Sequence, residues 1–156
     1  MSVIIKGLDN GYLYTKDNNR RIFKSAYTKD IMATSGSALI QIDGIGYCVG
    51  SGNTTVDIDK TDQEINKVCT LTNLAMSGNN EYYLVVGLPI GQYKLQREKF
   101  TKMIMGYNDC EVIYKDTPMD IKIKDVFVFP QGAGAVLSLN EIHGDCIVFD
   151  FGGLTI

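Results

Sequence analysis

Several features that mark large classes of protein are missing from this sequence of 156 residues. No run of about 18 apolar residues is present, as a membrane-spanning helix requires. Acidic residues slightly outnumber basic ones, and the net charge of -3 is unlike the basic surface of a nucleic-acid-binding domain. We therefore expect no direct contact with nucleic acid and none with a membrane.

Motifs for metal ions and for P-loop nucleotide sites are also absent. No Cys-x-x-Cys pair occurs, the four cysteines are far apart, and His143 is the only histidine. This pattern predicts buried, reduced thiols in a cytoplasmic protein instead of a zinc or redox site. Nothing in the sequence brings a cysteine and His143 together as nucleophile and base. The motif Gly-x-x-x-x-Gly-Lys-Ser/Thr is missing throughout, which excludes a P-loop.

The composition that remains is that of a globular domain. Hydrophobic residues make up 45% and charged residues 21% of the chain, and the length suits one compact domain or half of a larger protein. The first residues predict an antiparallel meander with strands at Ser2–Leu8, Tyr12–Lys16 and Arg21–Ala26. Farther along, strands alternate with helices, which predicts a mixed, five-stranded α/β sheet flanked by helices.

Hydrophobic spacing predicts the later elements. A capping box at Thr61 and Glu64 begins a helix that Gly78 ends. Glu81–Gly87 is mostly apolar and predicts a strand buried on both faces. A second helix covers Gln92–Met105. The other expected elements are strands at Ala38–Ile42, Tyr47–Val49, Cys110–Tyr114, Ile121–Phe129 and Cys146–Phe149 and a short helix at Gln131–Leu139.

The first motif that can carry chemistry, Asp9-Asn10-Gly11, lies between the first two strands. Asn-Gly is typical of a type I′ hairpin turn, which needs no function. A tight turn can also direct backbone N–H groups at an anion, while an adjacent carboxylate holds hydrated Mg²⁺. Lys16, seven residues after Asp9, could supply positive charge to a phosphate across the same hairpin.

The segment Phe149–Thr155, Phe-Asp-Phe-Gly-Gly-Leu-Thr, repeats this pattern. An apolar strand is followed by Asp150, a glycine turn and a hydroxyl residue. A second hairpin alone would explain it, but two Asp-led hairpins that face each other would hold the phosphates of a Mg-nucleotide from both sides. No lysine or arginine occurs from Asp125 to Ile156, and this acidic end suits either Mg²⁺ or a solvated surface.

The third motif is Phe129–Ala135, Phe-Pro-Gln-Gly-Ala-Gly-Ala. Pro130 ends a strand and Gln131 begins a helix, where small residues allow close packing on a sheet. The same position would let the Gln131 amide orient a water molecule that attacks a γ-phosphate, because phosphoryl transfer depends on positioning more than on covalent chemistry.

In this order, the three motifs resemble those of the actin/Hsp70/sugar-kinase ATPase superfamily. Asp9-Asn10-Gly11 with Lys16 resembles the first phosphate motif, Gln131 the connecting motif, and Asp150–Thr155 the second phosphate motif. Within the superfamily, Val86–Ile90 (Val-Gly-Leu-Pro-Ile) is similar to a segment of the ParM-like, plasmid-segregating bacterial actins. The resemblance implies a ribonuclease-H-like, actin-type fold.

The resemblance also implies roles for single residues. Asp9 and Asp150 would hold hydrated Mg²⁺, and Gln131 would be the catalytic residue that orients the attacking water. The phosphates of ATP or GTP would be bound by Asn10, Gly11, Lys16, Gly152, Gly153 and Thr155. Such proteins polymerise into filaments, hydrolyse the nucleotide, and move plasmids through an adaptor protein bound to a centromere.

Residues 1–156 would then be the N-terminal actin-like ATPase domain, cut before the second domain. With half of a nucleotide site, we expect the chain to bind nucleotide weakly and to hydrolyse none by itself. Two other functions stay open. One is a small-molecule kinase of the same superfamily, for which the Ser35–Asn53 insert offers only the carboxylate of Asp43. The other is a non-catalytic scaffold that keeps the fold without turnover.

Overall fold

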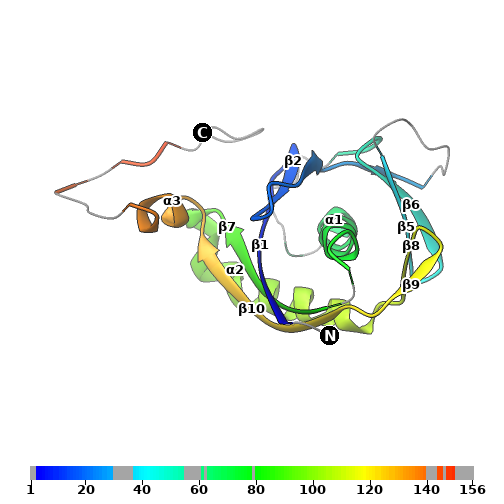
Figure 1. The fold of residues 1–156 in the computed structure, drawn as a ribbon. Coiled ribbons are helices and arrows are strands. Elements are labelled where there is room, and N and C mark those ends of the chain that lie inside the picture. The colour runs from blue at the N-terminus through cyan, green and yellow to red at the C-terminus, as the bar shows by residue number, and fades with distance from the viewer. Residues whose placement is uncertain are drawn as a thin grey trace.

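The computed structural model describes residues 3–29, 37–54, 61, 63–78, 80–139, 144–145 and 147–149. Two five-stranded sheets curve around a central helix (Figure 1). The first, here the mixed sheet, has the spatial order β10 (Lys122–Pro130), β7 (Glu81–Leu88), β1 (Val3–Asn10), β2 (Tyr14–Asp17) and β3 (Ile22–Lys24). The second, here the antiparallel sheet, has the order β4 (Tyr27–Thr28), β6 (Ile45–Val49), β5 (Ala38–Ile42), β8 (Val112–Tyr114) and β9 (Thr117–Met119).

Strand directions in the mixed sheet follow from the connections between its strands. β1, β2 and β3 form the predicted antiparallel meander, whereas β7 pairs in parallel with both β1 and β10. Parallel neighbours need a long crossover, and the two crossovers contain helices α1 (Glu64–Ala75) and α2 (Ile90–Met105). A short helix, α3 (Ala133–Leu137), follows β10. The predicted mixed, five-stranded sheet flanked by helices is confirmed.

The antiparallel sheet was not expected as a separate sheet. β5 and β6 match predicted strands, but β4 has two residues and β9 has three, with Pro118 in its middle. Such short strands carry little periodicity, and they form because longer neighbours supply their pairing partners. The strand predicted at Cys146–Phe149 is wrong for residues 147–149, which have no regular structure, and Cys146 lies outside the described residues.

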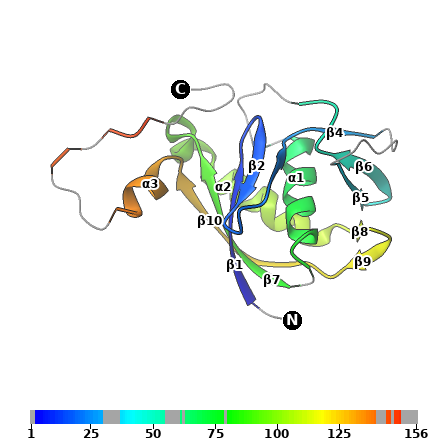
Figure 2. The same ribbon diagram turned by 45° about the horizontal axis from the view of Figure 1, so that its top comes forward.

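Helix α1 occupies the space between the two sheets (Figure 2). Ten of its twelve residues are buried, and they include polar side chains. The predicted capping box is wrong, because the helix begins at Glu64 with Gln63 as its N-cap and without a side-chain capping bond. The Glu64 carboxylate instead accepts hydrogen bonds from the hydroxyl groups of Tyr27 and Tyr47.

The hydrophobic core joins α1 to both sheets and to α2. Alternate residues of β7, from Tyr82 to Leu88, are buried, while the residues between them are only half-buried. The predicted burial of this strand on both faces is therefore wrong. Helix α2 is amphipathic as predicted, with Phe100 and Ile104 buried and its lysines exposed. Within the described residues, no helix combines the length and the apolar character needed to cross a membrane.

A buried ion pair connects β1 to β2. The Nζ atom of Lys6 lies 2.6 Å from Oδ2 of Asp17, and both side chains are fully buried. Lys6 also donates to the Ser77 hydroxyl at 3.0 Å, just beyond the end of α1. Burial alone would raise the pKa of Asp17, but the hydrogen bond and charge of Lys6 hold that pKa below its usual value.

Arg21 adds a second cation at the same place. Its guanidinium group donates to Asp17 Oδ2 at 3.2 Å and to Ser77 Oγ at 2.8 Å. It also donates to the backbone oxygens of Asn73 and Met76, at 3.3 Å each. These carbonyl groups lie in the last turn and the C-cap of α1, where the helix dipole favours positive charge. The network therefore ties the hairpin of β1 and β2 to the end of the central helix.

We predict that Asp17→Asn destabilises the protein strongly, because it leaves the Lys6 charge buried opposite a neutral amide. The expected loss is about 3–5 kcal/mol of unfolding free energy, measured by urea denaturation. The matched control is Asp43→Asn, whose carboxylate lies 2.6 Å from Lys67 with both side chains partly exposed. That change should cost less than about 1 kcal/mol. Equal losses in the two variants would contradict the prediction.

Glu64 anchors the start of α1 to the antiparallel sheet. Besides Tyr27 and Tyr47, its carboxylate contacts Lys29 Nζ at 2.9 Å. The hydrogen bond from Tyr27 outweighs the effect of burial, and with the bonds from Tyr47 and Lys29 it lowers the pKa of Glu64 to about 2. Burial, followed by the hydrogen bond to Glu64, raises the pKa of Tyr27 to about 12.

We predict that the contribution of Glu64 to stability depends on pH. A carboxylate whose pKa falls from 4.5 to about 2 on folding stabilises the protein fully above about pH 4.5. This stabilisation is lost as the pH falls toward 2. The difference in unfolding free energy between the wild type and Glu64→Gln should therefore shrink between pH 5 and about pH 2. A difference that stays constant over this interval would contradict the prediction.

Candidate functional site

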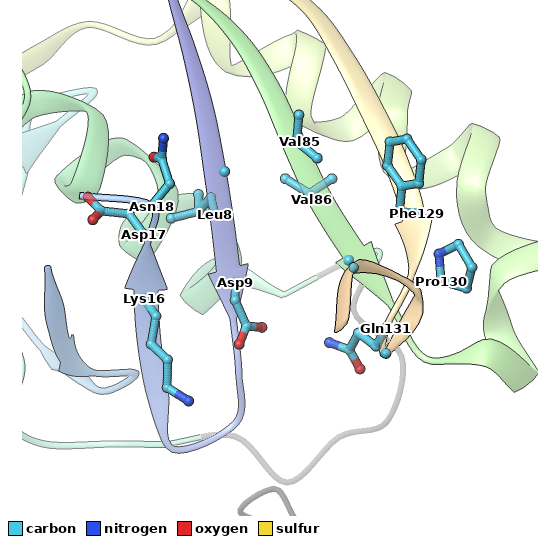
Figure 3. A pocket seen from close by; sticks show the side chains of 14 residues that line it. Leu8, Asp9, Lys16, Asp17, Asn18, Val85, Val86, Phe129, Pro130 and Gln131 are labelled. Carbon is cyan, nitrogen blue, oxygen red and sulfur yellow. The ribbon is translucent and has the colours of Figure 1, made fainter. Parts of the chain in front are cut away.

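A cleft of about 370 Å³ opens on the mixed sheet at the carboxyl ends of its parallel strands. Ligands of open α/β sheets commonly bind at this end. The residues that line the cleft come from β1, β2 and the turn after it, β7, β10, the turn after β10, and the start of α3: Gly7, Leu8, Asp9, Lys16, Asp17, Asn18, Val85, Val86, Gly87, Phe129, Pro130, Gln131, Gly132 and Gly134. Figure 3 shows that three polar side chains, those of Asp9, Lys16 and Gln131, reach its mouth.

Asp9 and Lys16 are direct partners across β1 and β2. Residues opposite each other in an antiparallel pair project from the same face of the sheet, and both side chains are exposed. Neither forms a hydrogen bond or an ion pair with any residue that the structure describes. One carboxylate and one ammonium group are therefore available to a ligand at this position.

Gln131 reaches the cleft from the end of β10. Its backbone N–H donates to the carbonyl oxygen of Leu88 at 2.7 Å, which fixes the turn against β7. Its side chain lies over Gly87, where a Cβ atom would be 3.0 Å from Gln131 Cγ. Glycine at position 87 thus leaves the space that the glutamine side chain occupies. The structure brings together Asp9, Lys16 and Gln131, which come from motifs far apart in the sequence.

Asn10 and Gly11 lie differently from Asp9. The Asn10 amide donates to Thr70 Oγ1 of α1 at 2.8 Å, on the face of the sheet opposite to the cleft. The Gly11 N–H donates to the Tyr14 carbonyl oxygen at 3.0 Å, and a Cβ atom on Gly11 would lie 2.8 Å from that oxygen. The predicted turn at Asp9-Asn10-Gly11 is wrong, since β1 extends through Asn10. The chain reverses at Tyr12 and Leu13.

The other predicted site residues, Asp150, Gly152, Gly153 and Thr155, lie outside the described residues. Their roles stay predictions. The sequence analysis assigned only Asp9, Lys16 and Gln131 of the cleft residues to the site, and among those it missed are Gly7 of β1 and Gly87 of β7. A glycine inside a strand often marks a close approach to that strand, and this signal could have identified both.

Solved structures of similar fold were found for nearly the whole chain. The apo ParM protein of psk41 has a TM-score of 0.72 and 15% identity, over 93% of this chain and 55% of that one. The Alp12 filament structure has a TM-score of 0.67 and 21% identity, over 92% and 51%. The archaeal actin homolog Ta0583 in complex with ADP has a TM-score of 0.67 and 23% identity, over 86% and 46%. The chain thus spans about half the length of these proteins.

A search of curated proteins found no match. The family model described as "Actin like proteins N terminal domain" matches residues 7–134, which include the second half of β1, all of β2, β7 and β10, and the whole cleft. The resemblance inferred from the three motifs is confirmed at the level of the family. The chain belongs to the family of N-terminal domains of actin-like proteins.

Proposed function

We propose that this chain is the nucleotide-binding domain of a filament-forming, actin-like ATPase that moves plasmids or other DNA. The observation that carries the proposal is the cleft, in which Asp9, Lys16 and Gln131 face one space. Family membership supports it. Two similar structures, an archaeal actin homolog in complex with ADP and the Alp12 filament, support nucleotide binding and self-assembly.

Each of the three side chains has a distinct role in this proposal. Lys16 binds phosphate oxygens through charge-assisted hydrogen bonds. Asp9, across the strand pair from Lys16, holds hydrated Mg²⁺. The Gln131 amide, which can both donate and accept, orients the water that attacks the γ-phosphate.

The donor set in the cleft fits magnesium. The described residues contain no group of three or more histidine, cysteine, aspartate or glutamate side chains that could enclose a metal ion. Mg²⁺ needs no such cage, because it keeps several waters and binds through one or two carboxylates and the substrate phosphates. When bound, it neutralises charge on the phosphates.

We further propose that residues 1–156 form the first of two domains. In this proposal Asp150, Gly152, Gly153 and Thr155 complete the phosphate site, and Asn10 and Gly11 shape the hairpin beside it. The nucleotide is ATP or GTP, and an adaptor protein bound to a centromere joins the filament to its DNA. The matched proteins are about twice as long as this chain, which is consistent with a second domain.

We predict that Lys16→Ala weakens the binding of MgADP to this chain by about tenfold, because a charge-assisted phosphate contact is lost. Isothermal titration calorimetry or NMR titration would measure the change. The matched control is Lys24→Ala, since Lys24 is exposed on β3 and does not line the cleft. An equal effect of both changes would mean that only the net charge matters, and no effect of either would remove Lys16 from the site.

We predict that Gln131→Ala in the full-length protein slows nucleotide hydrolysis on the order of 10²-fold, because the attacking water is no longer positioned. Filament assembly should persist, and the filaments should last longer. Phosphate release and light scattering, recorded on the same sample, would test both parts. Unchanged hydrolysis would show that Gln131 has no catalytic role, and loss of assembly would assign it a structural role.

A further inference from the structure

We propose that the buried Lys6–Asp17 ion pair selects the register of the β1–β2 hairpin and thereby decides that the Lys16 side chain, instead of the Asp17 carboxylate, reaches the mouth of the cleft. Lys6 and Asp17 are in this sense positioning residues for the site. The consequence for ligand binding rests on the proposed function. The register itself does not, and it can be tested separately.

The two faces of the hairpin have different tasks. On the inner face, toward α1, lie Lys6, Leu8 and Thr15, all buried, together with the Asp17 side chain. The Asp9 and Lys16 side chains project toward the cleft, and both are exposed. Since side chains alternate along a strand, a shift of one residue in β2 would exchange its two faces.

The exchange would place Lys16 on the inner face and Asp17 on the cleft face. Lys16 would then meet Lys6 and Arg21, which in the observed register both contact Asp17. Buried charges need an opposite partner, and three cations without a carboxylate would be strongly unfavourable. Because Lys16 and Asp17 are adjacent and opposite in charge, Lys6 discriminates between the two registers.

The turn between the strands lacks the residue pair that fixes a two-residue hairpin most strongly. Two-residue hairpin loops fix the register best when the central residues adopt positive φ, as Asn-Gly does. Tyr12 and Leu13 form this loop, and neither has positive φ. Backbone hydrogen bonds from Gly11 to the Tyr14 carbonyl, at 3.0 Å, and from Ser25 to the Leu13 carbonyl, at 2.9 Å, hold the loop. The interaction that distinguishes the registers by charge lies inside the hairpin, at Lys6.

The test is the double variant Lys6→Met/Asp17→Asn. It removes both charges but keeps an amide oxygen where Asp17 Oδ1 accepts the backbone N–H groups of Asn19 and Arg21, at 2.9 Å each. The matched control is Lys67→Met/Asp43→Asn, in which the pair is again 2.6 Å long and Oδ1 again accepts a backbone N–H, from Glu111. That second pair lies outside the hairpin.

The readout is the pattern of cross-strand Hα–Hα contacts in the NMR spectrum of the full chain. In the observed register Asn10 lies opposite Thr15. We expect the wild type and the control to show only the contacts of this register, among them the Asn10–Thr15 contact. In the Lys6→Met/Asp17→Asn variant this contact should weaken, and a second set from a shifted register should appear while the fold is retained. A single native set in that variant would overturn the proposal, and so would its unfolding while the control folds, because the pair would then serve stability alone.

MgADP titration of the same samples separates this inference from the proposed function. If both hold, the Lys6→Met/Asp17→Asn variant binds MgADP more weakly than the control, but by less than the tenfold effect of Lys16→Ala, because Lys16 leaves the cleft in only part of the molecules. If the register shifts but the affinity does not change, or if the wild type binds no MgADP, the nucleotide site fails and the register proposal stands.

Discussion

The burial of helix α1 between the two sheets is the constraint on which the rest of this structure depends. Although this helix is buried on nearly all sides, it needs polar residues, because both sheets direct polar side chains at its two ends. Ser77, just past its last turn, meets Lys6 and Arg21 of the mixed sheet, and Glu64 at its start meets two tyrosines of the antiparallel sheet. The helix therefore sets the position of both sheets through paired polar contacts, whose loss would leave buried groups without partners.

This arrangement separates structural from ligand-directed side chains along the same strands. On β1 and β2 the residues that face α1 carry the structural contacts, and the alternate residues face the cleft. Because Asp17 is neutralised by Lys6 on the inner side, Asp9 and Lys16 are left as one negative and one positive group at the cleft. The two-residue period of the strand makes this division possible.

Much of the fold could be predicted from the sequence, and the failures have physical causes. The meander, the two long helices and the β7 strand each have a local pattern of apolar residues, and these predictions are confirmed. The antiparallel sheet is built from strands of two to five residues whose pairing is non-local. The capping box failed because Tyr27 and Tyr47, distant in sequence, bind the Glu64 carboxylate that the motif required.

In the candidate site, too, residues with a local sequence motif could be predicted, whereas contacts between distant residues could not. Asp9, Lys16 and Gln131 could be grouped in advance because three motifs occur in a recognisable order, and the structure brings all three to one cleft. The role of Lys6 could not be predicted in this way. A single lysine within an apolar strand does not indicate which carboxylate it will pair with in the folded protein. Its partner is determined only when β2 folds back on β1, eleven residues later.

The charges at the cleft mouth also bear on the kind of ligand that fits there. Among the lining residues that the structure describes, Lys16 is the only lysine or arginine, and Asp9 lies directly opposite it in the sheet. A free anion would gain from Lys16 but would be repelled by Asp9 at close range. A phosphate that carries its own hydrated cation presents both signs, with the cation toward Asp9 and the oxygens toward Lys16. The pairing of one carboxylate with one ammonium group across β1 and β2 therefore favours a metal–phosphate complex over a bare phosphate.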